Sequence, residues 1–157
     1  MSSQVLSTQG LALAAFVRLL RGHAAVTRAL SAQLQSEFGL TINDYEALLR
    51  LANAEDGRMR RIDLANELVL TASGVTRLLD GLERAGYVAK ASCDSDARVT
   101  YAVLTDEGRE RFAEASRAHV DAIRALFGER FDDEELATLG RLLGRLPGAA
   151  DADDCAP

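Results

Sequence analysis

The sequence is poor in residues that interrupt helices or build covalent and metal frameworks. Proline occurs only at positions 147 and 157, so nothing before Pro147 forces a break in a helix. Two cysteines, Cys93 and Cys155, are too few for a disulfide framework. Two histidines, His23 and His119, are too few for a metal cluster of the usual kind. We therefore expect no metal and no other cofactor.

Long apolar segments and targeting signals are also missing. No uninterrupted apolar run approaches the roughly 18 residues that span a bilayer. Residues 1–6 lack the basic region that opens a secretory signal. These absences predict a cytoplasmic protein without a membrane partner. The length of 157 residues predicts one compact domain or a core with arms.

Charge is unevenly distributed along the chain. The net charge of −6 argues against a simple basic nucleic-acid binder. Residues 58–98, however, contain seven Lys or Arg and six Asp or Glu, so this segment is slightly positive and the remainder is acidic. An acidic body keeps a protein soluble and directs the less acidic segment toward phosphate.

Hydrophobic periodicity predicts three helices in the first part of the chain. Apolar residues recur at three- or four-residue steps over residues 9–37, which predicts a helix of about 43 Å that ends at Gly39. Thr41 and Asp44 form a capping-box pair for a second helix, which Gly57 closes. A short apolar pattern over residues 61–68 predicts the third.

A fourth helix and a hairpin follow. Thr71 caps a helix over residues 72–85, with leucines and a valine on one face and polar side chains on the other. Residues 87–91 and 99–104 are rich in β-branched and aromatic side chains, which predicts two strands with a polar tip between them.

Two more helices complete the predicted fold. Thr105 caps a fifth helix, and Asp132 and Glu135 form a capping box for the last, which runs to about residue 146. Residues 148–157 form an acidic tail that we expect to be disordered. The predicted fold is mainly α, with a two-stranded β-hairpin and long N- and C-terminal helices.

The third and fourth helices and the hairpin together predict a winged helix-turn-helix lobe that binds duplex DNA. The outward residues near the start of the fourth helix are Ser73, Thr76 and Arg77. Small hydroxyl side chains let a helix enter the major groove, and arginine can bind guanine O6 and N7. At the hairpin tip, Arg98 can reach the DNA backbone or minor groove, and Asp96 can hold it through an ion pair.

Four segments resemble signatures of the MarR family. Residues 71–88 (TASGVTRLLDGLERAGYV) resemble its recognition helix, and residues 62–65 (IDLA) resemble the helix before it. Residues 94–98 (DSDAR) and 104–108 (LTDEG) resemble its wing. The resemblance implies a winged-helix homodimer that binds a pseudo-palindromic operator. Such proteins are most often repressors released by small phenolic or lipophilic ligands or by oxidation.

The resemblance also implies a domain plan over residues 9–147. The DNA-binding lobe would span about 43–104, and dimerisation helices about 9–37 and 105–146. Family DNA contacts fall on six positions, which are Thr71, Ser73, Thr76, Arg77, Asp96 and Arg98. Two departures from the family pattern reduce the positive charge and polarity expected at the DNA-binding surface. Ala97 stands where a second basic residue is usual, and Gly81 stands where a larger polar residue is common.

The ends of the chain are expected to form a dimer. A first helix of about 43 Å is too long for one small lobe to cover, so its apolar residues and those of the last helix should pack across a two-fold axis. That axis would set two recognition helices roughly 34–36 Å apart, one turn of DNA. The family's effector pocket implies a small aromatic or lipophilic ligand, for which His23, Tyr45 and His119 are candidate residues.

The sequence also bears on three other functions. An enzyme is not expected, because the sequence has neither a phosphate-binding loop nor a nucleophile elbow, and no catalytic residues are assigned. A redox-responsive regulator is an alternative, because Cys93 lies near the wing. A protein-interaction module that has lost DNA binding is another, which Gly81, Ala97 and the acidic balance keep open.

Overall fold

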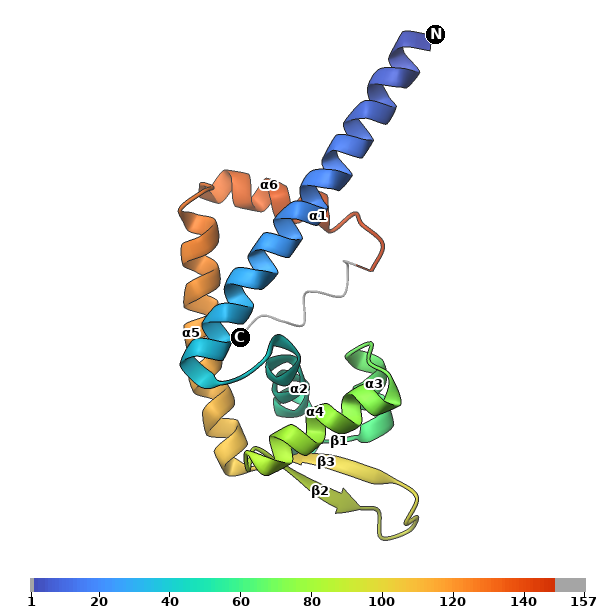
Figure 1. The fold of residues 1–157 in the computed structure, drawn as a ribbon, viewed down its shortest axis with the longest axis vertical. Coiled ribbons are helices and arrows are strands. Elements are labelled where there is room, and N and C mark those ends of the chain that lie inside the picture. Colours follow the sequence, from blue (N-terminus) through green and yellow to red (C-terminus); the bar gives the residue numbers. More distant parts are fainter. Residues whose placement is uncertain (1, 149–157) are drawn as a thin grey trace. The chain divides into compact units, whose positions relative to one another are not determined.

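The computed structural model describes the backbone of residues 2–148 and the side chains of residues 10–148, and Figure 1 shows a mainly helical chain with a small sheet. The elements are α1 (Ser2–Phe38), α2 (Ile42–Asn53), the short 3-10 turn η1 (Glu55–Gly57), β1 (Arg58–Arg60), α3 (Arg61–Glu67), α4 (Ala72–Arg84), β2 (Val88–Ser92), β3 (Thr100–Leu104), α5 (Asp106–Gly128) and α6 (Asp133–Leu143). They form two compact units, one ending at His119 and the other beginning at Val120.

The sheet has one more strand than the sequence predicted. Strands β2 and β3 form the expected antiparallel hairpin, and β1 pairs with the other edge of β3. In β1 only Met59 faces the core side, between exposed Arg58 and Arg60. A strand of three residues is too short to show a reliable alternation, and its partner lies far along the chain. The wing therefore belongs to a three-stranded sheet.

Helix caps are where local sequence predicted them. Thr41 and Asp44 form a reciprocal capping box at α2, and Asp132 and Glu135 form another at α6. At α5, the Thr105 hydroxyl accepts the Gly108 N–H at 3.0 Å. Each of these pairs satisfies backbone N–H groups that the first helical turn leaves without partners.

Two predicted boundaries were wrong. Helix α1 begins at Ser2 rather than at residue 9, so the weakly periodic start of the chain is also helical. Helix α2 ends at Asn53, because Ala54 adopts an extended conformation (φ −74°, ψ 150°). Gly57, with φ +64°, instead ends the turn η1 and directs the chain into β1. A positive φ is a conformation that glycine adopts without strain.

The core of the first unit is built mainly from leucines. The largest fully buried side chains are Leu34, Leu48, Leu51, Leu64 and Leu79. Helix α4 packs on α2, α3 and β2 and buries Val75, Leu79 and Leu82. Ile62 in α3 does not join them, since it is 67% exposed. Burial of one face of α4 leaves its other face to solvent.

The N-terminal half of α1 extends beyond the other elements of this unit (Figure 1). Its exposed large apolar side chains are Leu11, Leu13, Phe16, Leu19 and Leu20. By length and composition alone, residues Gly10–Phe38 are long and apolar enough to cross a membrane. No uninterrupted apolar run in the sequence is this long, because Arg18, Arg21 and Arg28 are scattered among the apolar residues of the helix.

The second unit contains the end of α5 and all of α6. The rings of Phe127 and Phe131 lie 6.3 Å apart. Leu142 and Leu143 in α6 and Leu146 after it are exposed, and no residue of α6 is buried. Most of the predicted acidic tail, residues 149–157 with Cys155, lies outside the described residues.

Candidate nucleic-acid interface

The first turns of α4 present small polar side chains and one arginine. Thr71 caps the helix by accepting the Gly74 N–H at 3.1 Å. Ser73, Thr76 and Arg77 are all exposed, on the side opposite Val75 and Leu79. The Thr76 hydroxyl donates to the Ala72 carbonyl at 2.9 Å, so its oxygen remains able to accept a hydrogen bond. This surface has the size and polarity to enter a major groove.

The second half of α4 differs from the first. Asp80, Glu83 and Arg84 line an open hollow there. Two carboxylates and one guanidinium give this hollow a net negative charge, which repels phosphate. The part of α4 that suits DNA is therefore its N-terminal half.

The tip of the wing is held by Asp96. Its Oδ1 accepts the Arg98 backbone N–H at 3.0 Å and lies 3.4 Å from Arg98 Nε. The expected ion pair is thus present, and the Arg98 side chain is still 93% exposed. The turn closes through two backbone bonds, Val99 N–H to Asp96 O and Cys93 N–H to Val99 O. A short turn fixes the base of Arg98 and leaves its end free to bind.

Cys93 lies directly after β2, at the base of this tip. Its Sγ lies 3.1 Å from the Ser95 hydroxyl. That hydrogen bond, with help from the backbone of Ser95 and Asp96, lowers the pKa of the Cys93 thiol. The side chain is half-buried. A lowered pKa raises the fraction of reactive thiolate at neutral pH.

The structure brings together two of the three candidate ligand-binding residues. The rings of Tyr45 in α2 and His119 in α5 lie 4.7 Å apart, and both are buried. The Tyr45 hydroxyl donates to Ser116 at 3.3 Å, and His119 Nδ1 lies 3.4 Å from Gln33 Oε1 in α1. Burial lowers the pKa of His119.

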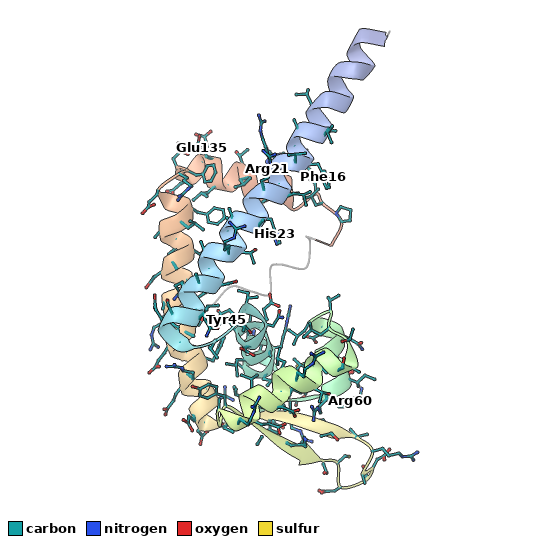
Figure 2. All side chains as sticks on the ribbon, viewed as in Figure 1. Phe16, Arg21, His23, Tyr45, Arg60 and Glu135 are labelled. Carbon is teal, nitrogen blue, oxygen red and sulfur yellow. The ribbon has the colours of Figure 1, made fainter. Side chains whose placement is uncertain are left out.

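His23 does not join this pair. Its ring is exposed on α1 and lies 3.5 Å from the Thr27 hydroxyl one turn further along (Figure 2). Periodicity alone placed His23 on the apolar stripe of α1, but among the described side chains of α1 only Leu34, three turns further along, is buried. The three residues therefore do not line one crevice within this unit.

The lowered pKa of His119 predicts a pH-dependent stability. Below the ordinary histidine pKa of 6.5, the unfolded chain protonates this ring while the folded chain resists protonation. The unfolded state then binds more protons, so stability should fall as pH falls through that value and level off below the folded pKa. Urea midpoints measured across this range should show the fall. His119→Gln should flatten it, with His23→Gln as control; an unaltered profile in His119→Gln would contradict the assignment.

Sequence reasoning missed the residues of β1 at this surface. The Arg58 guanidinium lies 4.0 Å from the centre of the Tyr101 ring. Arg60 Nε donates to Asp63 Oδ2 at 2.8 Å, a hydrogen bond that raises the pKa of Arg60. The basic cluster at residues 58–61 could have indicated a DNA-facing surface, but the sequence analysis used it only in the charge balance of residues 58–98.

Comparison with known proteins identifies the lobe. A family model described as MarR family matches residues 38–99. The HTH-type transcriptional repressor YetL of Bacillus subtilis is 33% identical over 108 residues, covering 69% of this chain. The match covers 64% of YetL, so this chain spans slightly less than two thirds of that relative.

Two solved structures from Streptomyces coelicolor share the fold. AbsC, a MarR family transcriptional regulator, is 34% identical with a TM-score of 0.74, over 83% of this chain and 88% of AbsC. Sco3205, a MarR family regulator solved in complex with DNA, is 30% identical with a TM-score of 0.75, over 83% of this chain and 81% of Sco3205. The chain therefore belongs to the MarR family of DNA-binding transcriptional regulators, which are not enzymes.

Proposed function

We propose that this regulator is a cytoplasmic homodimeric repressor that recognises a pseudo-palindromic operator and is released by a small ligand. The observation that carries the DNA-binding part is the polar N-terminal half of α4, which is exposed beside an arginine-tipped wing. The DNA-binding lobe would span residues 43–104, and the dimerisation helices residues 9–37 and 105–146. The crystal structure of the similar protein Sco3205, which is in complex with DNA, supports this assignment.

The six site residues divide by the kind of DNA contact that each favours. Ser73, Thr76 and Arg77 would face base edges, because they occupy the exposed side of α4. Thr71 would fix the start of that helix through its cap. Arg98 would bind the sugar-phosphate backbone or minor groove, and Asp96 would position it. Base specificity and general affinity should therefore be separable by mutation.

Arg98→Ala should weaken binding to every duplex sequence and make the dependence of log K on log salt shallower by about one.

Arg77→Ala should instead relax base preference at one position in each half-site, with a loss of about 1–3 kcal/mol of discrimination against the wrong base. Binding sites selected from random DNA, followed by titration at several salt concentrations, measure both effects. Arg84→Ala, which removes an exposed charge from the C-terminal half of α4, is the control. Identical selected motifs for Arg77→Ala and wild type would refute base reading by Arg77.

A second copy of the chain is the proposed cover for the apolar side chains of α1. Leu11 is 72% exposed and Phe16 is 54% exposed. A group of exposed large apolar side chains on one helix marks an interaction site. A membrane is a poorer occupant, because Arg18, Arg21 and Arg28 lie within the same helix (Figure 2 labels Arg21). Each buried arginine would cost about 2.5–3.5 kcal/mol at the centre of a bilayer.

Phe16→Asp should therefore weaken the dimer and, with it, binding to a two-half-site operator. A charge buried at an apolar interface is strongly unfavourable. Light scattering should report a dimer mass for the wild type and a shift toward the monomer for Phe16→Asp. Ile62→Asp adds the same charge at an apolar position of α3 that is 67% exposed and lies outside the dimerisation helices, and it should leave the mass unchanged. A monomeric wild type at micromolar concentration would exclude the proposed dimer.

Release by a small ligand is supported by the polar cluster beneath α2. The rings of Tyr45 and His119 meet there at a tilt of 49°, and Gln33 Nε2 is buried without a hydrogen-bond partner among the described residues. A buried donor without a partner is unfavourable, and a ligand with an acceptor group would satisfy it. Release of operator DNA by aromatic carboxylates, lost in Tyr45→Ala and His119→Ala, is the expected result.

The redox-responsive alternative rests on Cys93. A thiol with a lowered pKa at the base of the wing could be oxidised where DNA contact is sensitive to shape. That alternative requires mild oxidation to release DNA from the wild type but not from Cys93→Ser.

A wild-type protein that binds no duplex under any condition would instead favour the hypothesis of a protein-interaction module that has lost DNA binding.

A further inference from the structure

Arg60 has a geometry that the wing arginine repeats. Asp63 accepts a hydrogen bond from Arg60 Nε at 2.8 Å, and Asp96 lies 3.4 Å from Arg98 Nε. In both pairs the carboxylate engages the inner nitrogen of the guanidinium. Within the described part of the chain, neither terminal Nη nitrogen of Arg60 makes a hydrogen bond. Those two nitrogens form the fork that binds a phosphate with two parallel hydrogen bonds.

Strand pairing places Arg60 between two parts of the proposed DNA interface. Arg60 stands opposite Tyr101 in the register of β1 with β3, and β3 begins just after the wing tip that carries Arg98. The next residue after Arg60 begins α3, the first helix of the helix-turn-helix. Figure 2 shows Arg60 on the side of the lobe where α4 begins and the strands lead to the wing tip.

The other exposed arginine of β1 is differently engaged. Arg58 lies over the face of Tyr101, where the aromatic ring occupies one side of its guanidinium. Arg60 is instead held by a carboxylate at Nε, and about half of its side chain is exposed (53%). Its outer N–H donors are therefore oriented and accessible to an anion.

We propose that Arg60, positioned by Asp63, binds a backbone phosphate of the operator and forms a second anchor beside the wing. The inference rests on the proposed DNA interface. The first helix of a helix-turn-helix crosses the DNA backbone, which matches a residue at the start of α3. A phosphate contact carries no base information, so Arg60 sets the position and affinity of the lobe and not its sequence preference.

The test uses the duplex that the full-length wild type selects from random DNA, titrated at several salt concentrations. Arg60→Ala should weaken binding and make the slope of log K against log salt shallower by about 0.9, the value for one lost phosphate contact. Arg60→Lys should retain part of the affinity, because the charge remains but the fork is lost. Arg84→Ala, which removes an exposed charge from the half of α4 that does not suit DNA, should keep the wild-type slope.

Asp63→Asn separates positioning from simple charge. Removing this carboxylate makes the lobe more positive, so charge alone predicts tighter binding. The proposal predicts weaker binding, and a smaller effect of Arg60→Ala in the Asp63→Asn background. An unchanged slope in Arg60→Ala, or tighter binding by Asp63→Asn, would overturn it. If the wild type binds and Arg98→Ala weakens it, that failure concerns Arg60 alone; if the wild type binds no duplex, the proposed function itself fails.

Discussion

The Gly108→Ala variant is expected to unfold at a much lower urea concentration than the wild type. A Cβ at this position in the first turn of α5 would overlap the carbonyl oxygen of Tyr87, and it would lie 2.9 Å from Leu104 Cδ1. Inserting atoms into a filled site costs about 1–3 kcal/mol and sometimes more. Because the overlap here is with backbone, we expect the upper part of that range.

The carbonyl of Tyr87 cannot easily move aside. It accepts the Thr105 backbone N–H at 3.1 Å, and the Thr105 hydroxyl donates to the neighbouring Gly86 carbonyl at 2.7 Å. These bonds join the turn after α4 to the start of α5. Displacing Tyr87 would therefore break the cap of α5 and loosen the end of α4.

Gly81→Ala provides the matched control. An added Cβ at Gly81 meets nothing within 4 Å. Alanine is also favoured over glycine within a helix by about 1 kcal/mol. The same chemical change should thus stabilise the protein at position 81 and destabilise it at position 108. Equal midpoints for Gly108→Ala and wild type would show that the two backbone segments do not meet as described.

Leu79→Ala is expected to have the second large effect. Leu79 is fully buried on the core side of α4. Truncating a buried leucine costs about 2–5 kcal/mol, because apolar contacts are lost and a cavity remains. Since the leucine holds the helix whose other face carries Thr76 and Arg77, DNA affinity should fall together with stability.

Ile62→Ala is the control for this substitution. Ile62 is also a large apolar residue of the same lobe, but it is 67% exposed. Exposed substitutions usually change stability by about 0.5 kcal/mol or less. Urea unfolding of both variants gives the comparison. A similar loss of stability in both would mean that burial does not distinguish the two positions.

Much of the fold was predictable because the interactions that decide it are local. The caps at Thr41, Thr71 and Asp132 involve residues three positions apart. The apolar spacing of α4 similarly predicted its buried leucines and its exposed polar face. The ion pair of Asp96 with Arg98 spans two residues and was also expected. Each of these needs only the neighbouring sequence and the geometry of a helix or a turn.

Other features were decided only when distant segments met. The pairing of β1 with β3 placed Arg60 opposite Tyr101, and no periodicity in three residues could indicate it. The packing of α2 against α5 brought Tyr45 to His119 but left His23 exposed. The lack of space at Gly108 depends on Tyr87, which reaches it through a turn and a hairpin.

The sequence by itself determined the helices, their caps and the polar surface of α4, because side-chain spacing and short-range hydrogen bonds set them. Tertiary structure alone decided the third strand, the surroundings of His119 and the position of Arg60. Those depend on which surfaces the chain buries against one another, and burial is a property of the whole packed unit rather than of any single segment.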